Sequence, residues 1–303
     1  MVNNKMGILL NLRTLAFLML AVGSLCSARA QQSHAELEGA EVRVYKHASD
    51  TDLKISIVYP EDYNAKKKYP AIIFFFGGGW KGGSVQQFRH HCRYFASRGM
   101  IAMTADYRVM SRNGTTPYEA VEDARSALRW VKIHAKELGI HKKKIVAAGG
   151  SAGGHLALST ASIDDVNDDE DDLSIDPGPH ALVLFNPVVN TMPEGYGFNA
   201  FEDSAGAKRL SPYHHINRKM PPTIIFHGDA DTTVPISNVQ DLCRIMKENG
   251  RRCELLVYQG QKHAFFNYGR ENHKYYILTV AAADRFLQSL GFISKREVVE
   301  IIP

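Results

Sequence analysis

Residues 146–158 read VAAGGSAGGHLAL and place four glycines around a single serine, Ser151. A β-rich apolar run ends just before the first glycine, and a helix-like segment follows the last. Glycine costs conformational entropy and adds no packing, so such a cluster marks a sharp turn or a close backbone approach. Residues 149–153 match G-x-S-x-G, in which a strand-to-helix turn lifts the serine hydroxyl above a sheet edge. The stretch predicts an α/β fold with Ser151 as a nucleophile. The alternative, a phosphate-binding loop, lacks both G-x-G-x-x-G and G-K-S/T.

Short β-rich runs alternate with amphipathic segments along the chain. The β-rich runs lie at 42–45, 53–59, 71–76, 101–106, 144–148, 181–185, 223–226 and 253–258. The helix candidates lie at 86–97, 118–138, 153–162, 236–249 and 272–290. From the third run onward the strands are nearly all apolar, as expected in a parallel sheet buried on both faces. The first two runs are too close together for a helix between them, so we expect an antiparallel hairpin at the edge. The pattern predicts a mostly parallel eight-stranded sheet with helices on both faces.

Residues 1–30 are typical of an export signal. Basic residues precede an apolar stretch at 15–22, and residues 28–30 read ARA, a small-residue cleavage site. A membrane anchor is the alternative, but the stretch is far shorter than the ~20 residues that a span needs. We predict that residues 1–30 are a signal peptide and that residues 31–303 form one domain. The protein is then exported, periplasmic or secreted, without stable membrane insertion.

Charge argues against nucleic acid as a partner. Residues 1–30 hold Lys5, Arg13 and Arg29 and no acid, so their removal lowers the formal charge from +4 to +1. The composition, 45% hydrophobic and 22% charged, fits one large core. An acidic stretch at 164–172, DDVNDDEDD, lacks the glycine of an EF-hand loop. We expect a solvated surface loop there, with a calcium site as the alternative.

Three cysteines remain once residues 1–30 are removed. An exported protein meets oxidising surroundings, in which disulfides form. Cys243 falls within a predicted helix and Cys253 at the start of the next predicted strand, so these two are the favoured pair. The alternative is two buried thiols. Cys92 is predicted to be a core residue.

A nucleophilic serine needs a base, and the base needs an orienting carboxylate. In this architecture the chain order is serine, acid, histidine, and functional side chains follow the carboxyl ends of strands. The stretch TIIFHGDADTTVP places Asp231 after a buried strand, and Asp229 would tighten the same turn. Downstream lie only His263, in the loop GQKHAFF, and His273, in a predicted helix. We predict Asp231 and His263 as the partners of Ser151. Four further histidines are predicted to be structural: His155, His214, His215 and His227.

The third requirement is a set of donors for the developing oxyanion. Residues 74–80 read FFFGGGW and end a predicted strand, which exposes the amides of Gly77, Gly78 and Gly79. We predict that Gly78 and Gly79, together with the amide of Ala152, form the oxyanion hole. Trp80 is predicted to form a wall of the pocket, with a plain core position as the alternative.

Four stretches together resemble the esterase branch of the α/β-hydrolase superfamily that is related to hormone-sensitive lipase. They read ADYR, GGSAGGH, HGDADTTVP and GQKHAFF, and the resemblance spans roughly residues 40–290. Phe76 stands where this branch usually has a histidine before three glycines. Only about eleven residues separate Gln31 from the first predicted strand. No large N-terminal cap is therefore expected, and the pocket should be open and shallow.

The resemblance implies an α/β-hydrolase catalytic domain that acts as a serine carboxylesterase through an acyl-enzyme, without a metal or organic cofactor. An exported enzyme with an open site is similar to the bacterial acetyl-xylan and feruloyl esterases. The expected partner is an ester-bearing carbohydrate or another small-molecule ester, with acetyl groups preferred over feruloyl groups on polysaccharides. Three alternatives use the same fold: a prolyl-oligopeptidase-like serine peptidase, a lipase for long acyl chains, and a non-catalytic binding module.

Overall fold

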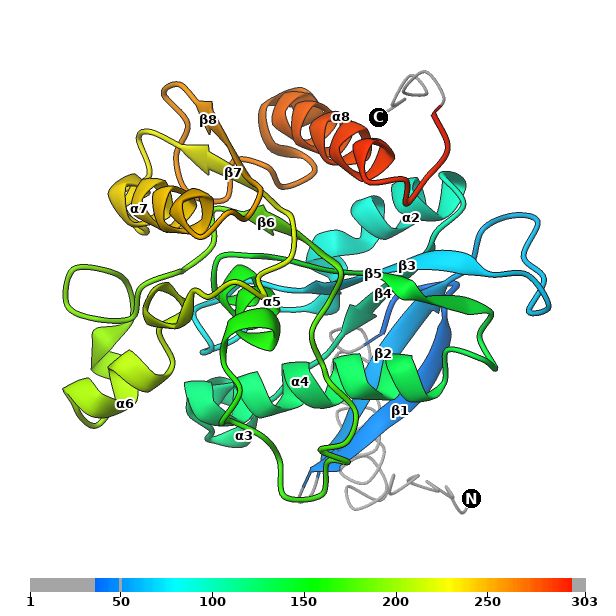
Figure 1. Cartoon of the computed structure of the whole chain (residues 1–303), viewed down its shortest axis with the longest axis horizontal. Helices are drawn as coiled ribbons and strands as arrows, with labels where there is room; N and C mark the ends of the chain where they lie inside the picture. Colours follow the sequence, from blue (N-terminus) through cyan, green and yellow to red (C-terminus); the bar gives the residue numbers. More distant parts are fainter. Residues whose placement is uncertain (1–35, 49–50, 296–303) are drawn as a thin grey trace, which may run out of the picture.

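The computed structural model describes residues 36–48 and 51–295, so the predicted signal peptide lies outside the described residues. Eight strands form one sheet in the order β1-β2-β4-β3-β5-β6-β7-β8 (Figure 1). The strands are β1 (Glu41–Ala48), β2 (Thr51–Val58), β3 (Tyr69–Phe75), β4 (Ile101–Ala105), β5 (Ile140–Gly150), β6 (Ala181–Phe185), β7 (Thr223–Gly228) and β8 (Cys253–Tyr258). The predicted fold class is confirmed.

The first two strands form the predicted hairpin at the edge of the sheet. β1 pairs antiparallel with β2, and β2 pairs antiparallel with β4. All the other neighbours, from β4 across to β8, run parallel. The carboxyl ends of the parallel strands therefore meet at one edge, and the loops after β3, β5, β7 and β8 converge there.

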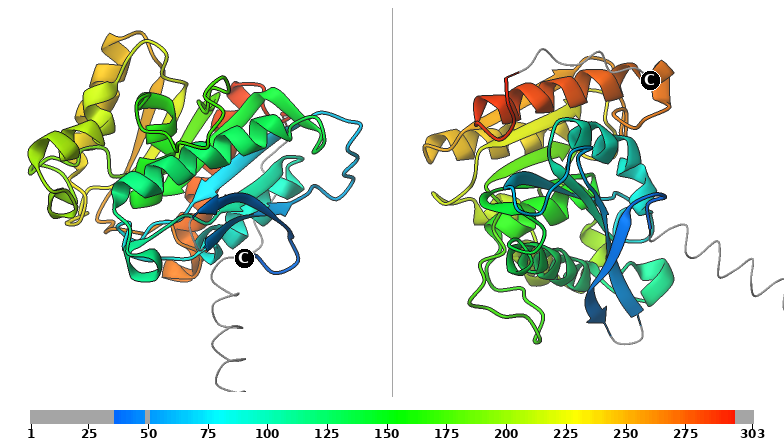
Figure 2. Two further views of the ribbon diagram at one scale, coloured as in Figure 1. Left: turned by 90° about the horizontal axis from the view of Figure 1, so that it is seen from below. Right: turned by 90° about the vertical axis from the view of Figure 1, so that its right-hand side faces the viewer.

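Helices cover both faces of the sheet, because right-handed crossovers that run in opposite directions along a sheet lie on opposite sides. One face carries α2 (Arg89–Ser97) and α8 (Lys274–Ser289), and the other carries α4 (Pro117–Ile133), α5 (Ala152–Ser162) and α7 (Ile236–Glu248) (Figure 1 and Figure 2). The other helical segments are η1 (Val85–Phe88), α3 (Met110–Asn113), η2 (Phe198–Ala200), α6 (Ser204–Arg209), η3 (Pro212–His215) and η4 (Arg270–His273).

Three helix ends differ from the predicted ones by two residues or more. The segment predicted at 86–97 begins as the short helix η1, so α2 itself starts at Arg89. α4 ends at Ile133, and the chain continues in turns before β5 begins. α8 begins two residues later than predicted, because Glu271, Asn272 and His273 have φ values of 44°, 50° and 64°. Three consecutive residues in the left-handed region form the separate turn η4 and cannot belong to the right-handed helix α8.

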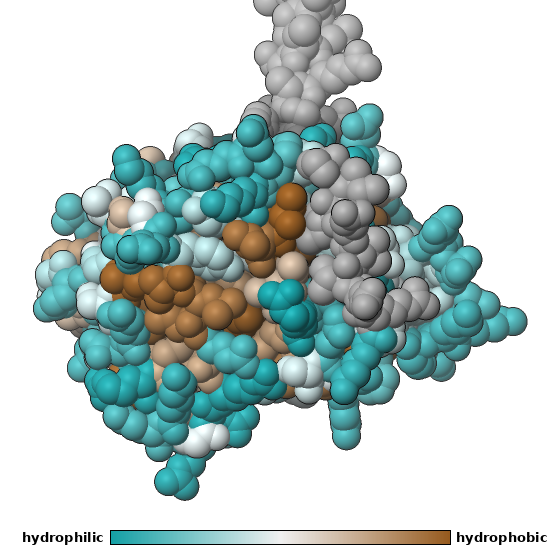
Figure 3. Space-filling model, turned by 90° about the horizontal axis from the view of Figure 1, so that it is seen from above, coloured by the Kyte–Doolittle hydropathy of each residue, from teal (hydrophilic) through white to brown (hydrophobic). Residues whose placement is uncertain are grey.

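The central strands explain the apolar sequence pattern. Every residue of β4 and β6 is buried, as expected for strands covered on both faces. The edge strand β8 is more open, with Leu256 37% and Val257 48% exposed. Figure 3 shows an apolar area on the side of the molecule that carries α8. Because the fully buried strands lie in the middle of the sheet, the core is centred on β3 to β6, directly beneath the loops that follow β3 and β5.

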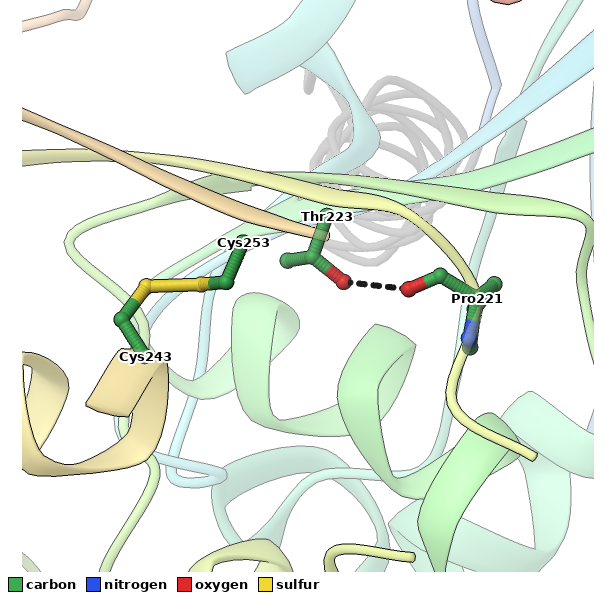
Figure 4. The surroundings of a disulfide bond; sticks show 4 residues. All are labelled: Pro221, Thr223, Cys243 and Cys253. Atoms are coloured by element: carbon green, nitrogen blue, oxygen red, sulfur yellow. Dashed lines mark hydrogen bonds between the residues drawn. A yellow bond between two sulfur atoms is a disulfide. The ribbon is translucent and has the colours of Figure 1, made fainter. Parts of the chain in front are cut away.

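A disulfide joins Cys243 in α7 to Cys253 at the start of β8, with 5.3 Å between the two Cα atoms (Figure 4). The predicted pairing is confirmed, and Cys92 is a buried free thiol as expected. The bond ties a surface helix to the edge strand of the sheet. By restricting the unfolded chain, a link that closes so short a loop contributes about 2–3 kcal/mol.

The acidic stretch at 164–172 lies at the surface as predicted, and its exposed acids are Asp164, Asp165, Asp169, Glu170 and Asp172. Three of its carboxylates also pair with basic groups of neighbouring elements. Asp168 lies 2.6 Å from Lys46, Asp171 lies 2.5 Å from Arg129, and Asp165 lies 2.9 Å from Arg209. The first two pairs are largely buried, so they dock the stretch onto β1 and α4 while its other acids face water. Within the described part of the chain, no group of acidic, histidine or cysteine side chains is placed to hold a metal ion.

His91 on α2 lies in the apolar layer between this helix and the sheet. Its ring centroid is 4.9 Å from that of Phe88, 5.3 Å from that of Phe185 and 5.8 Å from that of Phe74. Both ring nitrogens are buried without a hydrogen-bond partner. Burial lowers the pKa of His91 to about 3. The neutral ring therefore contributes its full stability above the unfolded pKa of about 6.5, and this is lost as the pH falls from there toward 3.

We expect His91→Phe to make the folded protein less sensitive to acid. At pH 5 the removal of the titrating ring should stabilise the protein by about 2 kcal/mol relative to the change at pH 8. The measurement is the melting temperature of both proteins at pH 8, 6.5 and 5. Parallel melting curves across this range would show that His91 is not a source of acid sensitivity.

Candidate active site

Ser151 lies in the turn between β5 and α5, at the carboxyl edge of the sheet. Its backbone has φ 54° and ψ −120°, which a non-glycine residue adopts only where the surrounding structure holds it. A side chain at Gly153 would overlap the backbone carbonyl oxygens of Phe75 and Phe76. The glycine cluster therefore allows α5 to begin directly against the end of β3, with the serine at the tip of the turn.

The structure brings together the three residues predicted as the catalytic triad. Nε2 of His263 lies 2.9 Å from Oγ of Ser151, and Nδ1 of His263 lies 2.7 Å from Oδ2 of Asp231. Asp231 follows β7 and His263 follows β8, so three separate strand ends supply the three groups. The arrangement has the hydrogen-bond order that a Ser-His-Asp nucleophile needs.

Asp231 is held as an ionised acceptor. Its side-chain Oδ1 accepts hydrogen bonds from the backbone N–H groups of Thr233 and Val234, at 2.9 and 3.0 Å. Burial by itself raises the pKa of Asp231, but the hydrogen bonds from His263 and from these amides outweigh it and lower the pKa below its usual value. The stabilisation is therefore present above the unfolded pKa and is lost as the pH falls through the lower folded pKa.

The residues predicted to be structural lie outside the triad. Nε2 of the buried His155 lies 2.6 Å from the carbonyl oxygen of Leu210, and burial lowers the pKa of this histidine to about 4. Asp229 accepts a hydrogen bond from the N–H of Gly260 at 2.6 Å, which tightens its turn as predicted. Two more of the predicted structural histidines make local contacts. Nδ1 of His214 lies 2.8 Å from Oγ of Ser211, and Nε2 of His215 lies 3.3 Å from the carbonyl oxygen of Lys208.

Asn186, at the end of β6, belongs to the site although nothing in the sequence pattern pointed to it. It is fully buried and has φ 35°. Its Oδ1 accepts a hydrogen bond from the N–H of Ala264 at 2.9 Å, and its Nδ2 lies 3.5 Å from Nε2 of His263. The asparagine thus holds the start of the histidine loop against the central strands.

His227, which was predicted to be a structural histidine, also lies next to the carboxylate of the site. Its Nε2 donates to the carbonyl oxygen of Val234 at 3.0 Å, as a structural histidine would, but it also lies 3.5 Å from Oδ2 of Asp231. Burial lowers the pKa of His227. The neutral ring therefore presents an N–H beside the carboxylate without adding a second full charge.

The glycines after β3 do not all offer their amides. The N–H of Gly77 donates to Oε1 of Gln87 at 2.7 Å, so it is already used. No described residue accepts a hydrogen bond from the amide of Gly78 or Gly79. The amide of Ala152 is at the first position of α5, where a helix leaves its N–H groups without intrahelical acceptors. The three donors predicted for the oxyanion hole are thus free within the described chain.

Other groups support the oxyanion loop at Phe76, where the resemblance predicts a histidine. The hydroxyl of Tyr107 donates to the carbonyl oxygen of Phe76 at 2.8 Å, and the two rings stack at 4.2 Å. Gln87 accepts from Gly77 and donates through Nε2 to Oδ1 of Asn267 at 3.0 Å. Because Asn267 lies in the same loop as His263, one glutamine ties the oxyanion loop to the histidine loop.

We expect Gln87→Leu to lower kcat for p-nitrophenyl acetate by about 10- to 100-fold, because a shift of about 1 Å in the reacting groups costs up to that much. The matched control is Gln240→Leu, since Gln240 is exposed on α7. The measurement is kcat and KM of the three proteins together with their melting temperatures. A fully active Gln87→Leu would show that the two loops are positioned without this side chain.

Trp80 is both buried and part of a pocket wall, so each predicted alternative holds in part. It is 2% exposed, and its ring meets that of His155 edge-on at 5.0 Å. It also lines a cavity together with Gly79 and Tyr196. The long connection between β6 and β7, which includes η2, α6 and η3, thus forms one side of the cavity next to the oxyanion loop. Whether a cap precedes β1 depends mostly on residues outside the described ones.

No helix in the described part of the chain is long and apolar enough to cross a membrane.

Comparison with known proteins places the chain among esterases. A family model described as BD-FAE matches residues 55–193, and one described as the prolyl oligopeptidase family matches residues 189–289. Structures of Thermogutta terrifontis esterase 2 with propionate and with butyrate bound are 47% and 46% identical to the chain, each with a TM-score of 0.82. Each alignment covers 86% of this chain and 97% of that one. Another structure shows the same esterase phosphorylated by paraoxon, at 46% identity and a TM-score of 0.81.

Curated relatives are more distant. Esterase LipC of Mycobacterium tuberculosis is 25% identical over 219 residues, which is 66% of this chain and 54% of LipC. The probable carboxylic ester hydrolase LipM of the same organism is 28% identical over 247 residues, 72% of this chain and 54% of LipM. The chain therefore spans about half the length of these curated relatives.

Proposed function

The chain belongs to the α/β-hydrolase family of serine carboxylic ester hydrolases that includes Thermogutta terrifontis esterase 2, and within it we propose an exported esterase that removes short acyl groups from polysaccharides. Acetyl groups are the first candidate and feruloyl groups the second. The observation that carries the proposal is the hydrogen-bonded series from Ser151 through His263 to Asp231. It lies beside the free amides of the oxyanion loop.

The geometry supports a two-step hydrolysis through an acyl-enzyme. Oγ of Ser151 attacks the ester carbonyl carbon while Nε2 of His263 accepts its proton, and Asp231 stabilises the resulting imidazolium. The carbonyl oxygen becomes an oxyanion at the amides of Gly78, Gly79 and Ala152. His263 then returns the proton to the leaving alcohol as the C–O bond breaks. Water repeats the sequence on the acyl-enzyme and releases the acid.

Two comparisons support a short acyl group. Propionate and butyrate are the acids bound in the structures of esterase 2, a protein that also reacts with paraoxon. We propose that this chain accepts acyl groups of similar size and that such organophosphates would modify Oγ of Ser151. The match to the prolyl oligopeptidase family covers the acid and histidine loops, so a peptidase is the second candidate.

The test is the release of acetate and ferulate from acetylated xylan and from feruloylated arabinoxylan fragments. p-Nitrophenyl esters from acetate to octanoate measure chain-length preference, and a prolyl peptide p-nitroanilide tests the peptidase. We expect acetate release and a preference for short p-nitrophenyl esters. Hydrolysis of the p-nitrophenyl esters without any release from polysaccharide would contradict the proposed substrate, and peptide cleavage would favour the second candidate.

Export is part of the proposal and has its own test. The Cys243–Cys253 disulfide supports an oxidising compartment. We expect the mature protein recovered from the native or a bacterial host to begin at Gln31. An intact N-terminus on protein recovered from the cytoplasm would contradict export.

A further inference from the structure

We infer that the cavity beside the oxyanion loop binds the sugar residue that carries the ester, an inference that rests on the proposed function. The cavity has a volume of about 470 Å³, within the usual range for small-ligand sites. Its walls come from the oxyanion loop and from the connection between β6 and β7. The residues that matter for the inference are Gly79, Trp80, Lys81, Tyr196, Phe198 and Asn199.

The cavity adjoins the reacting centre through Gly79. This glycine lines the cavity and is also one of the three amides available to the oxyanion. A Cβ atom at Gly79 would lie 2.7 Å from the hydroxyl oxygen of Tyr196. A group bound in the cavity is therefore in contact with the residue that would hold the carbonyl oxygen of the same substrate.

The loop that forms the outer wall is fitted closely to the protein. The N–H of Tyr196 donates to the carbonyl oxygen of Asn190 at 2.9 Å. The ring of Tyr196 lies 5.9 Å from the ring of Trp80. A Cβ atom at Gly197 would lie 2.5 Å from the indole of Trp80, so only glycine lets the loop approach so closely. The buried Trp80 therefore supports the loop that forms the outer wall, so the cavity is already formed without a ligand.

The chemistry of the walls suits a sugar better than an alkyl chain. Tyr196 and Phe198 present half-buried aromatic rings, which pack against the apolar face of a pyranose. The Tyr196 hydroxyl, the Lys81 ammonium and the Asn199 amide have no hydrogen-bond or ion-pair partner among the described residues. Sugar hydroxyls satisfy such groups, whereas an alkyl chain would displace their water and leave them unpaired.

The experiment compares acetylated xylo-oligosaccharides with methyl acetate, whose alcohol is too small to fill the cavity. The variants are Phe198→Ala, Asn199→Ala and Lys81→Ala. We expect kcat/KM for the oligosaccharides to fall by about tenfold for Phe198→Ala, the change produced by losing roughly 1.4 kcal/mol of binding, mainly through KM. The two polar variants should show smaller decreases in the same direction. All three should hydrolyse methyl acetate within about twofold of the unaltered protein.

Two control variants, Lys68→Ala and Leu173→Ala, remove an exposed cation and an exposed apolar side chain outside the cavity. They should leave both substrates unaffected. Equal losses on both substrates, or a changed preference between methyl acetate and methyl butyrate, would overturn the inference, because the cavity would then serve catalysis or the acyl group. Unchanged variants of a protein that deacetylates sugars would overturn only the inference. No acetate release by the unaltered protein would overturn the proposed substrate as well.

Discussion

Ser151→Ala is expected to lower kcat for p-nitrophenyl acetate by about 10⁴-fold or more while the protein stays folded. Without Oγ no acyl-enzyme can form, and only the oxyanion donors and substrate binding remain to assist direct attack by water. The rate should therefore fall to the residual level typical of hydrolases that lack their nucleophile. The measurement is steady-state hydrolysis together with single-turnover acylation, which should disappear in the variant.

The melting temperature distinguishes the loss of catalysis in Ser151→Ala from a loss of the folded structure. The Ser151 hydroxyl makes one side-chain hydrogen bond, to His263. Alanine retains the Cβ atom that is already accommodated at φ 54°, so the strain of the turn is unchanged. We expect the melting temperature to change by no more than a few degrees. Ser159→Ala, which removes a buried hydroxyl from α5, the helix that follows Ser151, is the control and should stay active. Substantial activity of Ser151→Ala would refute the mechanism.

Asp231→Asn is expected to lower kcat by about 10³- to 10⁴-fold at neutral pH, because it reverses the histidine tautomer. Oδ1 of Asp231 accepts two backbone N–H groups, from Thr233 and Val234. An asparagine must place its oxygen there, so its NH₂ group would face Nδ1 of His263. Nδ1 then accepts, and Nε2 carries the proton toward Ser151. A histidine in this state cannot remove the serine proton.

The matched control for this substitution is Asp229→Asn, two residues earlier in the same loop. Asp229 accepts a hydrogen bond from Gly260, and an amide oxygen can accept it equally well. We expect this control to retain nearly full kcat and KM across pH 6 to 9. An Asp231→Asn variant as active as the Asp229→Asn variant would show that the carboxylate does not set the tautomer, whatever its distance from the imidazole.

Much of the fold and the three reacting groups could be predicted because their signals are local. The elbow around Ser151 combines a strand, a glycine-rich turn and a helix within a few residues, and this combination has few alternative structures. Asp231 and His263 each follow a strongly apolar strand, and parallel strands must bring their carboxyl ends to one edge. Chain order then leaves few candidates for each role. The disulfide could be predicted in the same way, from a cysteine in a helix and another at the start of the next strand.

The supports of the site could not be predicted, because they depend on contacts between distant segments. Gln87 joins Gly77 to Asn267, and Asn186 joins the end of β6 to Ala264. Glutamine and asparagine occur on many surfaces, and no periodic pattern marks these two as buried parts of a site. The two buried ion pairs of the acidic stretch could not be predicted for a related reason, since they depend on Lys46 of β1 and on Arg129 of α4.

The amino-acid order by itself determined which strands form the sheet, where the nucleophile turns, and which acid and histidine can reach it. Backbone propensity and the periodic spacing of apolar residues depend on neighbouring positions, so they can be recognised in the local sequence. Only the tertiary structure decided which glycine amides stay free, what holds the histidine loop, and that a cavity opens beside Gly79. Those features depend on side chains from separate loops meeting within hydrogen-bond distance, and such distances exist only once the whole sheet has assembled.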